Sequence, residues 1–283
     1  PMKKRAVFVL VCLSVFLSSC GKEERAAGAE SSMQVGNFCY TEEGLAYARP
    51  NGPNEKGKMD YLDYETGSYY PLCARANCRH DGPECTAVSF AEQSRMGRLG
   101  DKWYRFKLLD GGKTEICSCD LDGGKEKTIT VFPHEIDWTS IFYEKYCIVV
   151  SQDVFFDETT NEWLGNNSAI YRIDLETGES ELLCPEKRER NTAYYLYGKK
   201  GNLLVYREWT GTIHELRIMD LRTGEIQNPL PGKALWMDAS MSGNDFVCSV
   251  TENGENTVIK LDLETGKWEK ILINGIEQGA ESF

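Results

Sequence analysis

Short runs of alternating apolar and polar residues recur along the chain, and turns separate them. Residues 169–173 and 258–261 are runs of this kind that precede a turn, and residues 267–273 follow one. A period of two, in runs rich in β-branched and aromatic residues, is typical of strands with one buried face. No long amphipathic helical segment stands out between the runs. The pattern therefore predicts an all-β fold of antiparallel hairpins.

The turns share one sequence, Asp-x-x-Thr-Gly or a close variant, and it occurs five times. The Asp side chain can accept backbone N–H groups one or two residues further on, and the Gly can adopt the positive φ of a G1 bulge. Successive copies begin between 42 and 57 residues apart, a period typical of repeat architectures. The pairs are Asp63 and Gly67, Asp120 and Gly124, Asp174 and Gly178, Asp220 and Gly224, and Asp262 and Gly266.

Four strand-like runs can be assigned to most repeats, and three to the second. We therefore expect a β-propeller of four-stranded antiparallel blades, in which neighbours bury the apolar face that each blade would expose alone. Two interpretations of the five repeats stay open: a ring of five blades that closes by side-chain packing, or a truncated version of a larger ring. Independent hairpins in a β-sandwich are the alternative, which the even spacing disfavours.

The N-terminus is predicted to be a targeting segment. Lys3, Lys4 and Arg5 precede an apolar stretch, residues 6–17, that is too short to span a bilayer comfortably. Residues 17–21, Leu-Ser-Ser-Cys-Gly, resemble the lipobox of bacterial lipoproteins, which implies cleavage before Cys20 and its acylation, for example with palmitate. An ordinary secretory signal is the alternative. The expected organisation is a signal peptide at 1–19, lipidated Cys20 with a flexible tether at 20–35, and a propeller domain at 36–283.

The charge of the chain agrees with this location. Its 283 residues carry a formal net charge of −12, which disfavours nucleic acid and anionic membrane surfaces as partners. We expect the domain to lie at the outer face of the bacterial cytoplasmic membrane and to contact the membrane through its lipid anchor only.

One stretch carries three cysteines and a histidine after the first repeated turn: Cys73, Cys78, His80 and Cys85. Three thiolates and an imidazole are the ligand set of a closed structural zinc site, and a closed site leaves no open position for catalysis. A disulfide clamp is an equal alternative in an oxidising compartment, and free thiols are a third. Cys39, Cys147 and Cys248 lie inside strand-like runs and are expected to be small core residues.

The cysteine stretch and the repeated turn together carry a resemblance. Pro71-Leu-Cys73, Cys78-x-His80-Asp81 and Cys85-x-Ala87, directly after residues 63–67, resemble the N-terminal part of uncharacterised β-propeller lipoproteins of clostridia and related Firmicutes. The resemblance implies the fold and surface anchoring, and it implies no activity.

The sequence contains no nucleophile elbow, zinc-protease helix or phosphate-binding loop. His134 and His214 are isolated and are expected to be surface or satisfied core residues. The insertion at residues 152–167 carries Phe155, Phe156 and Trp163, which suit contact with a protein or glycan partner; that these side chains fold back onto the blade is an equal alternative. We therefore expect a lipid-anchored binding or scaffold module that uses one face of the ring. A glycoside hydrolase with paired carboxylates is the alternative, and Asp137 is a candidate for its channel.

Overall fold

Strands make up nearly all regular structure in this computed structural model. The chain has twenty-one strands and one short helix, α2 (Thr86–Ala91), among the residues that the structure describes, and neighbouring strands pair antiparallel. Within those same residues, no helix combines the length and hydropathy needed to cross a membrane. The all-β prediction is therefore confirmed. The described residues are 32–35, 38–49, 57–73, 75, 77–82, 84–91, 95–121, 123–156, 159–160, 163–187, 192–211, 213–242, 245–252 and 255–271.

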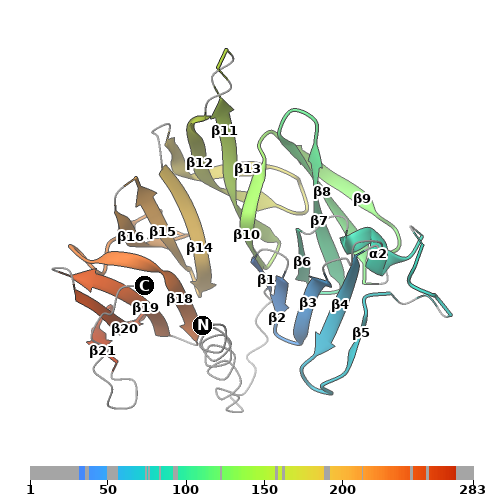
Figure 1. Ribbon diagram of the computed structural model, residues 1–283, viewed down its shortest axis with the longest axis horizontal. Coiled ribbons are helices and arrows are strands. Elements are labelled where there is room, and N and C mark those ends of the chain that lie inside the picture. Colours follow the sequence, from blue (N-terminus) through green and yellow to red (C-terminus); the bar gives the residue numbers. More distant parts are fainter. Residues whose placement is uncertain are drawn as a thin grey trace. The chain divides into compact units, whose positions relative to one another are not determined.

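The chain divides into two compact units: the described residues up to Asn228 form the larger one, and those from Pro229 onward form the smaller one. The larger unit holds four groups of four sequential strands (Figure 1). Group one is β2 (Phe38–Thr41), β3 (Gly44–Arg49), β4 (Lys58–Asp63) and β5 (Tyr69–Pro71); group two is β6 (Met96–Leu99), β7 (Lys102–Leu109), β8 (Lys113–Asp120) and β9 (Lys127–Phe132). Group three is β10 (Ile136–Tyr143), β11 (Tyr146–Phe156), β12 (Trp163–Asp174) and β13 (Ser180–Lys187); group four is β14 (Thr192–Lys200), β15 (Leu203–Thr210), β16 (His214–Asp220) and β17 (Ile226–Gln227).

The smaller unit contains a fifth group of four sequential strands. It consists of β18 (Ala234–Ser242), β19 (Asp245–Glu252), β20 (Glu255–Asp262) and β21 (Trp268–Lys270), paired in that order. Phe246, Cys248, Ile259 and Leu261 of this sheet are buried. The expected four-stranded antiparallel group is thus present in every repeat, although Met96–Leu99 of the second repeat was not among the predicted runs.

An additional strand, β1 (Ser32–Val35), joins groups one and three. It pairs antiparallel with β2 on one side and with β10 on the other, so that nine strands form one continuous sheet. The backbone N–H of Arg98 in β6 also donates to the Ser32 hydroxyl at 2.9 Å, which attaches β1 to group two. The prediction of a flexible tether through residue 35 is therefore wrong for Ser32–Val35. The earlier part of that segment, Cys20 and the predicted signal peptide lie outside the described residues.

Four of the five repeated turns have the predicted structure. In the turn after β12, the backbone N–H groups of Glu176 and Thr177 donate to Asp174 Oδ1 at 2.9 and 3.0 Å, and Gly178 adopts a φ of 78°. The Thr177 hydroxyl accepts the N–H of Glu179 at 3.2 Å, which explains why the turn prefers Thr at this position. The turns at Asp63, Asp220 and Asp262 repeat this arrangement, with Gly67, Gly224 and Gly266 at positive φ.

The turn after β8 is different. Its glycine at positive φ is Gly123 (φ 78°), and the N–H of Gly123 donates to the carbonyl of Asp120 at 2.8 Å. The expectation that Gly124 is the left-handed residue is therefore wrong. The sequence Asp-Leu-Asp-Gly-Gly reaches its first glycine one residue earlier than Asp-x-x-Thr-Gly does, so the turn is one residue shorter.

The core of the larger unit lies between successive groups of strands. Alternate residues of β11 face opposite sides: Cys147 and Val149 pack with Phe106 of group two, whereas Ile148 and Val150 pack with Tyr206 of group four. A third cluster joins groups one and two, with Cys39 and Met59 against Trp103. Each sheet is thus stabilised by burying its faces on its neighbours, as expected for stacked repeats. The prediction that Cys39, Cys147 and Cys248 are core residues is confirmed, because each is at most 1% exposed.

Residues 152–167 do not form the expected loop. β11 and β12 continue through this segment as a paired hairpin, with Asp153 opposite Asn167 and Phe156 opposite Trp163. The hairpin extends beyond the neighbouring strands of its group (Figure 1). The side chains of Phe155, Phe156 and Trp163 lie outside what the structure describes, so their predicted role in recognition stays a prediction.

One repeated turn packs closely against the preceding sheet. A Cβ atom on Gly178 would lie 2.9 Å from the Cβ of Thr130 and 3.0 Å from the carbonyl oxygen of Ile129, both in β9. Gly224 has the same turn position and a φ of 73°, but no atom lies within 4 Å of the corresponding Cβ position. Gly178 therefore meets a packing requirement in addition to the conformational one.

We predict that Gly178→Ala destabilises the protein more than Gly224→Ala does. Both variants place a side chain at positive φ, at a cost of about 1 kcal/mol, and only Gly178→Ala adds a clash with β9, which costs a further ~1–3 kcal/mol. Urea unfolding of the two variants measures the difference. Equal losses of stability would contradict the close approach of the turn to β9.

Candidate functional site: a cluster of three cysteines and a histidine

The cysteine stretch follows β5 and leads into α2. The backbone N–H of Leu72 donates to the carbonyl of Met59 at 2.8 Å, which fixes the start of the stretch on β4. The Thr86 hydroxyl at the start of α2 donates to the carbonyl of Leu72 at 3.1 Å and fixes its end. The thirteen residues between these points therefore form a loop whose two ends are held together.

The loop brings all four predicted ligands together. One donor atom from each of Cys73, Cys78, His80 and Cys85 lies within 4.8 Å of every other. His80 Nδ1 lies 3.3 Å from the sulfur of Cys85, and the Cys85 side chain is buried while the other three are half-buried. In a tetrahedral zinc site, Zn–S bonds of about 2.3 Å place sulfur atoms roughly 3.8 Å apart. The cluster can hold a metal ion such as zinc, as the sequence predicted.

The backbone of the loop adopts two unusual conformations to produce this convergence. Asn77 and His80 have φ values of 59° and 56°, in the left-handed region that residues with a side chain rarely occupy. For a histidine this conformation costs roughly 1 kcal/mol, and something in the folded loop must offset that cost. Packing contributes, because Cys73 and Cys78 contact the buried group of Cys85, Ala87 and Val88.

The thiols of the cluster differ in acidity. Burial raises the pKa of Cys73, but hydrogen bonds from Thr86, the Arg75 backbone and the neighbouring thiols outweigh burial and lower that pKa to about 6. Burial is the main reason why the pKa of Cys85 rises to about 11. One thiolate is therefore favoured at neutral pH. Thiolates are the metal-binding form, and a bound cation would favour deprotonation of the others as well.

A second polar group lies in the larger unit, and the sequence did not reveal it. His134 Nδ1 lies 2.7 Å from Asp153 Oδ2, and the Tyr171 hydroxyl lies 3.4 Å from His134 Nε2. His134 is thus a satisfied residue, as expected, although its partners, 19 and 37 residues away in the chain, could not be named from the sequence. Both ring nitrogens have partners, so the group links the β9–β10 connection to the long hairpin and offers no free base.

The carboxylate proposed for a channel is buried. Asp137 in β10 is 7% exposed, and burial raises its pKa, while the Trp138 backbone N–H and Arg95 oppose that rise. His214, the other histidine discussed above, stacks on Trp209, and burial followed by the charge of Arg207 lowers its pKa. His214 is half-buried, and within the described residues its buried Nδ1 has no hydrogen-bond partner, so the prediction of a surface or satisfied core residue is wrong for it.

No family model and no curated protein matches this chain. Among solved structures, it is similar to the β-propeller domain of the Trilobed protease from Pyrococcus furiosus, with 14% identity and a TM-score of 0.50 over 82% of this chain and 66% of that one. It is also similar to a structure from a study of two prolyl endopeptidases, with 13% identity and a TM-score of 0.50 over 90% of this chain and 36% of that one.

A puromycin hydrolase matches with 14% identity and a TM-score of 0.47 over 86% of this chain. The chain spans only 35% of the length of that hydrolase. At these identities the likeness concerns the fold, and the fold is that of a β-propeller.

We predict that the purified protein contains about one zinc ion and that Cys78→Ala or His80→Ala lowers this content well below one, because a closed tetrahedral site needs all four ligands. Removal of the metal with a chelator should lower the midpoint of thermal unfolding, since binding to the folded loop stabilises it. Elemental analysis and thermal unfolding measure the two effects.

Cys117→Ala is the matched control. Cys117 is a buried cysteine of β8 outside the cluster, so its loss should lower stability without changing the zinc content. If the wild-type protein contains no zinc and its Cys78 and Cys85 do not react with thiol reagents, the cluster is a disulfide clamp and not a metal site.

Proposed function

We propose that this protein is a lipid-anchored β-propeller at the outer face of the bacterial cytoplasmic membrane, where it binds a protein or glycan partner. The five groups of four strands are blades of one ring, and residues 1–19 are a signal peptide that is removed before Cys20 is acylated. A zinc ion bound by Cys73, Cys78, His80 and Cys85 clamps the loop after the first blade. The zinc is structural, because four protein ligands leave no position for a substrate.

The observation that carries the binding role is the extended hairpin of β11 and β12. Its paired strands continue to Phe156 and Trp163, beyond the ends of the neighbouring strands of group three. The pair His134 and Asp153 attaches the side of this hairpin to the preceding connection. A rigid, projecting hairpin presents its side chains to a partner at a low entropy cost, and aromatic residues contribute most to such interfaces.

Four convergent donors support zinc over a disulfide in the clamp. A disulfide would use two of the sulfur atoms and leave the third sulfur and the imidazole of His80 without a reason to converge on them. A bond from the His80 ring to a bound zinc ion would offset the cost of the left-handed conformation of His80.

A glycoside hydrolase is the second candidate, and Asp137 favours it. Burial raises the pKa of Asp137, and a raised pKa is the direction of shift that a general acid needs. The role would require a second carboxylate on the other side of a bound sugar.

Anchoring is tested with Cys20→Ala. We expect the wild-type protein to incorporate labelled palmitate in a bacterial host and to sediment with membranes, because two acyl chains hold a protein stably in a bilayer. Cys20→Ala should incorporate no label. Equal membrane retention of both proteins would show that the lipid is not what holds the domain.

Partner binding is tested with a triple variant, Phe155→Ala with Phe156→Ala and Trp163→Ala. We expect photo-crosslinking in intact cells to capture a partner with the wild-type protein. The yield of crosslinked partner should be at least about tenfold lower with the variant, since aromatic residues dominate interface energies. Leu108→Ala is the control, because Leu108 is an apolar residue that is 61% exposed on β7.

An equal yield of crosslinked partner from the triple variant and the Leu108→Ala control would show that the hairpin takes no part in recognition. If the wild-type protein releases reducing sugars from a polysaccharide and Asp137→Asn does not, the protein is a glycoside hydrolase and the proposed binding role is wrong.

A further inference from the structure

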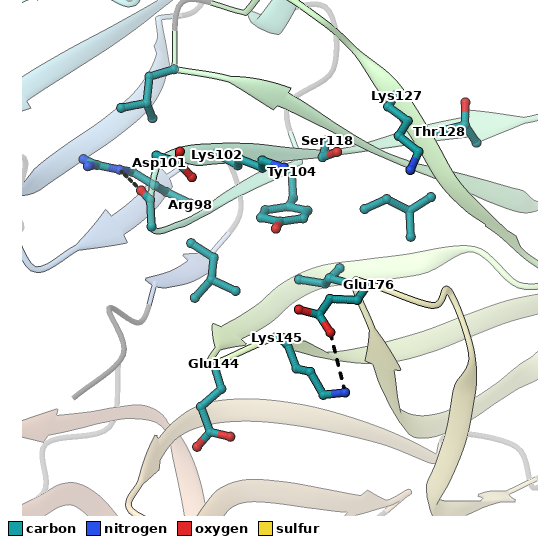
Figure 2. A pocket seen from close by; sticks show the side chains of 15 residues that line it. Arg98, Asp101, Lys102, Tyr104, Ser118, Lys127, Thr128, Glu144, Lys145 and Glu176 are labelled. Atoms are coloured by element: carbon teal, nitrogen blue, oxygen red, sulfur yellow. Dashed lines mark hydrogen bonds and ion pairs between the residues drawn. The ribbon is translucent and has the colours of Figure 1, made fainter. Parts of the chain in front are cut away.

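A cleft of about 750 Å³ lies between two groups of strands in the larger unit. One wall is the sheet of β6 to β9, and the opposite wall consists of the β10–β11 and β12–β13 turns (Figure 2). The second of these turns contains Gly178, whose lack of a side chain lets the turn lie close to β9. The cleft belongs to neither the cysteine cluster nor the long hairpin.

The two walls carry opposite charges. The sheet wall contributes three basic side chains, Arg98, Lys102 and Lys127, and one acidic side chain, Asp101. The turn wall contributes Glu144 and Glu176, with Lys145 as its single basic side chain. A ligand that lies across the cleft therefore meets a basic surface on one side and an acidic surface on the other (Figure 2).

Several of these charges are available to a ligand. Arg98 is paired with Glu43 at 2.8 Å, and Lys145 is paired with Asp174 at 2.7 Å. Within the described residues, Lys102, Lys127 and Glu144 have no hydrogen-bonded or ion-pair partner through their side chains. Among the same residues Asp101 has no such partner either, and Glu176 lies 3.8 Å from Lys145, so the unpaired charges are two basic and one acidic on the sheet wall and one acidic, Glu144, on the turn wall.

The floor of the cleft is apolar and aromatic. Tyr104 lies at its centre, with its ring between the two walls (Figure 2), and Ile129 and Leu175 line the space beside it. The Tyr104 ring packs on Phe142, with ring centroids 5.8 Å apart, so its position is fixed from behind. Burial, followed by the charges of Asp101 and Glu176, raises the pKa of Tyr104, so its hydroxyl keeps its proton and can donate.

Glu144 occupies a position that does not suit glutamate. It is the first residue of the two-residue turn between β10 and β11, and its φ is 52°. Turns of this length with positive φ at that position favour glycine. A strained residue in a cleft is a common sign of function, because its side chain is kept for something other than stability.

We propose that this cleft binds a short peptide segment with charges of both signs, whose acidic group faces Lys102 and Lys127 and whose basic group faces Glu144 and Glu176. An apolar side chain between the two charges packs on Tyr104, Ile129 and Leu175. A neutral glycan uses the aromatic ring but leaves the opposed charges without partners, whereas a dipolar peptide pairs with both walls. The inference rests on the proposed binding role and names a partner class for it.

The test uses the full chain and a blocked pentapeptide with Lys and Glu at its two ends and Phe at its centre. We expect calorimetry to detect binding, and the analogue with Gln in place of both charged residues to bind at least about tenfold more weakly. Lys127→Glu should weaken binding of the charged peptide roughly fivefold, since each partly exposed pair contributes modestly. Adding Glu144→Lys to Lys127→Glu should weaken binding further, because Lys102 and Glu176 keep their signs and each wall then carries one charge of each sign.

Glu144→Gly separates this role from a structural one. The variant should unfold at a higher temperature, because glycine suits the positive φ, and it should bind the charged peptide more weakly. Equal binding of the charged and neutral peptides, or tight binding of uncharged cellohexaose that depends on Tyr104, would overturn the inference. If no peptide binds while capture through the hairpin persists, the inference fails and the proposed function stands.

Discussion

The burial of each sheet on its neighbours is the constraint on which this structure depends. A four-stranded antiparallel sheet has two faces, and in group three both are apolar: Cys147 and Val149 point to one neighbour, and Ile148 and Val150 point to the other. Such a sheet cannot fold alone in water, because at ~25 cal/mol per Å² the exposed faces would cost more than its hydrogen bonds contribute. The unbroken apolar run of residues 147–150 in β11 is therefore a consequence of stacking, whereas the repeats were recognised in the sequence from their shared turns.

The parts of the fold that depend on local chemistry could be predicted from the sequence. Asp, Thr and Gly each have a defined partner within five residues, so four of the turns follow from their sequence alone. The turn at Asp120 was misassigned because two adjacent glycines leave the local rule ambiguous, and the register decides between Gly123 and Gly124. The cysteine cluster was also predictable, since its four ligands lie within thirteen residues and one loop can bring them together.

The parts that depend on distant segments could not be predicted. Nothing in residues 32–35 indicates that they pair with β10, more than a hundred residues later in the chain. The contact of His134 with Asp153 and Tyr171 also requires the register of three strands. The continuation of β11 beyond Ser151 was not recognised because Gln152 and Asp153 interrupt the apolar run, although the three residues that follow them are apolar.

The position of β1 has a mechanical consequence for a domain held at a membrane. If Cys20 carries the lipid, residues 21–31 can span at most about 40 Å, so the domain stays close to the bilayer. A force applied through residues 21–31 would act on β1, which lies between β2 and β10 and is hydrogen-bonded to β6 through Ser32. The load would be shared among three groups of strands at once, and a single outer strand would not have to bear it.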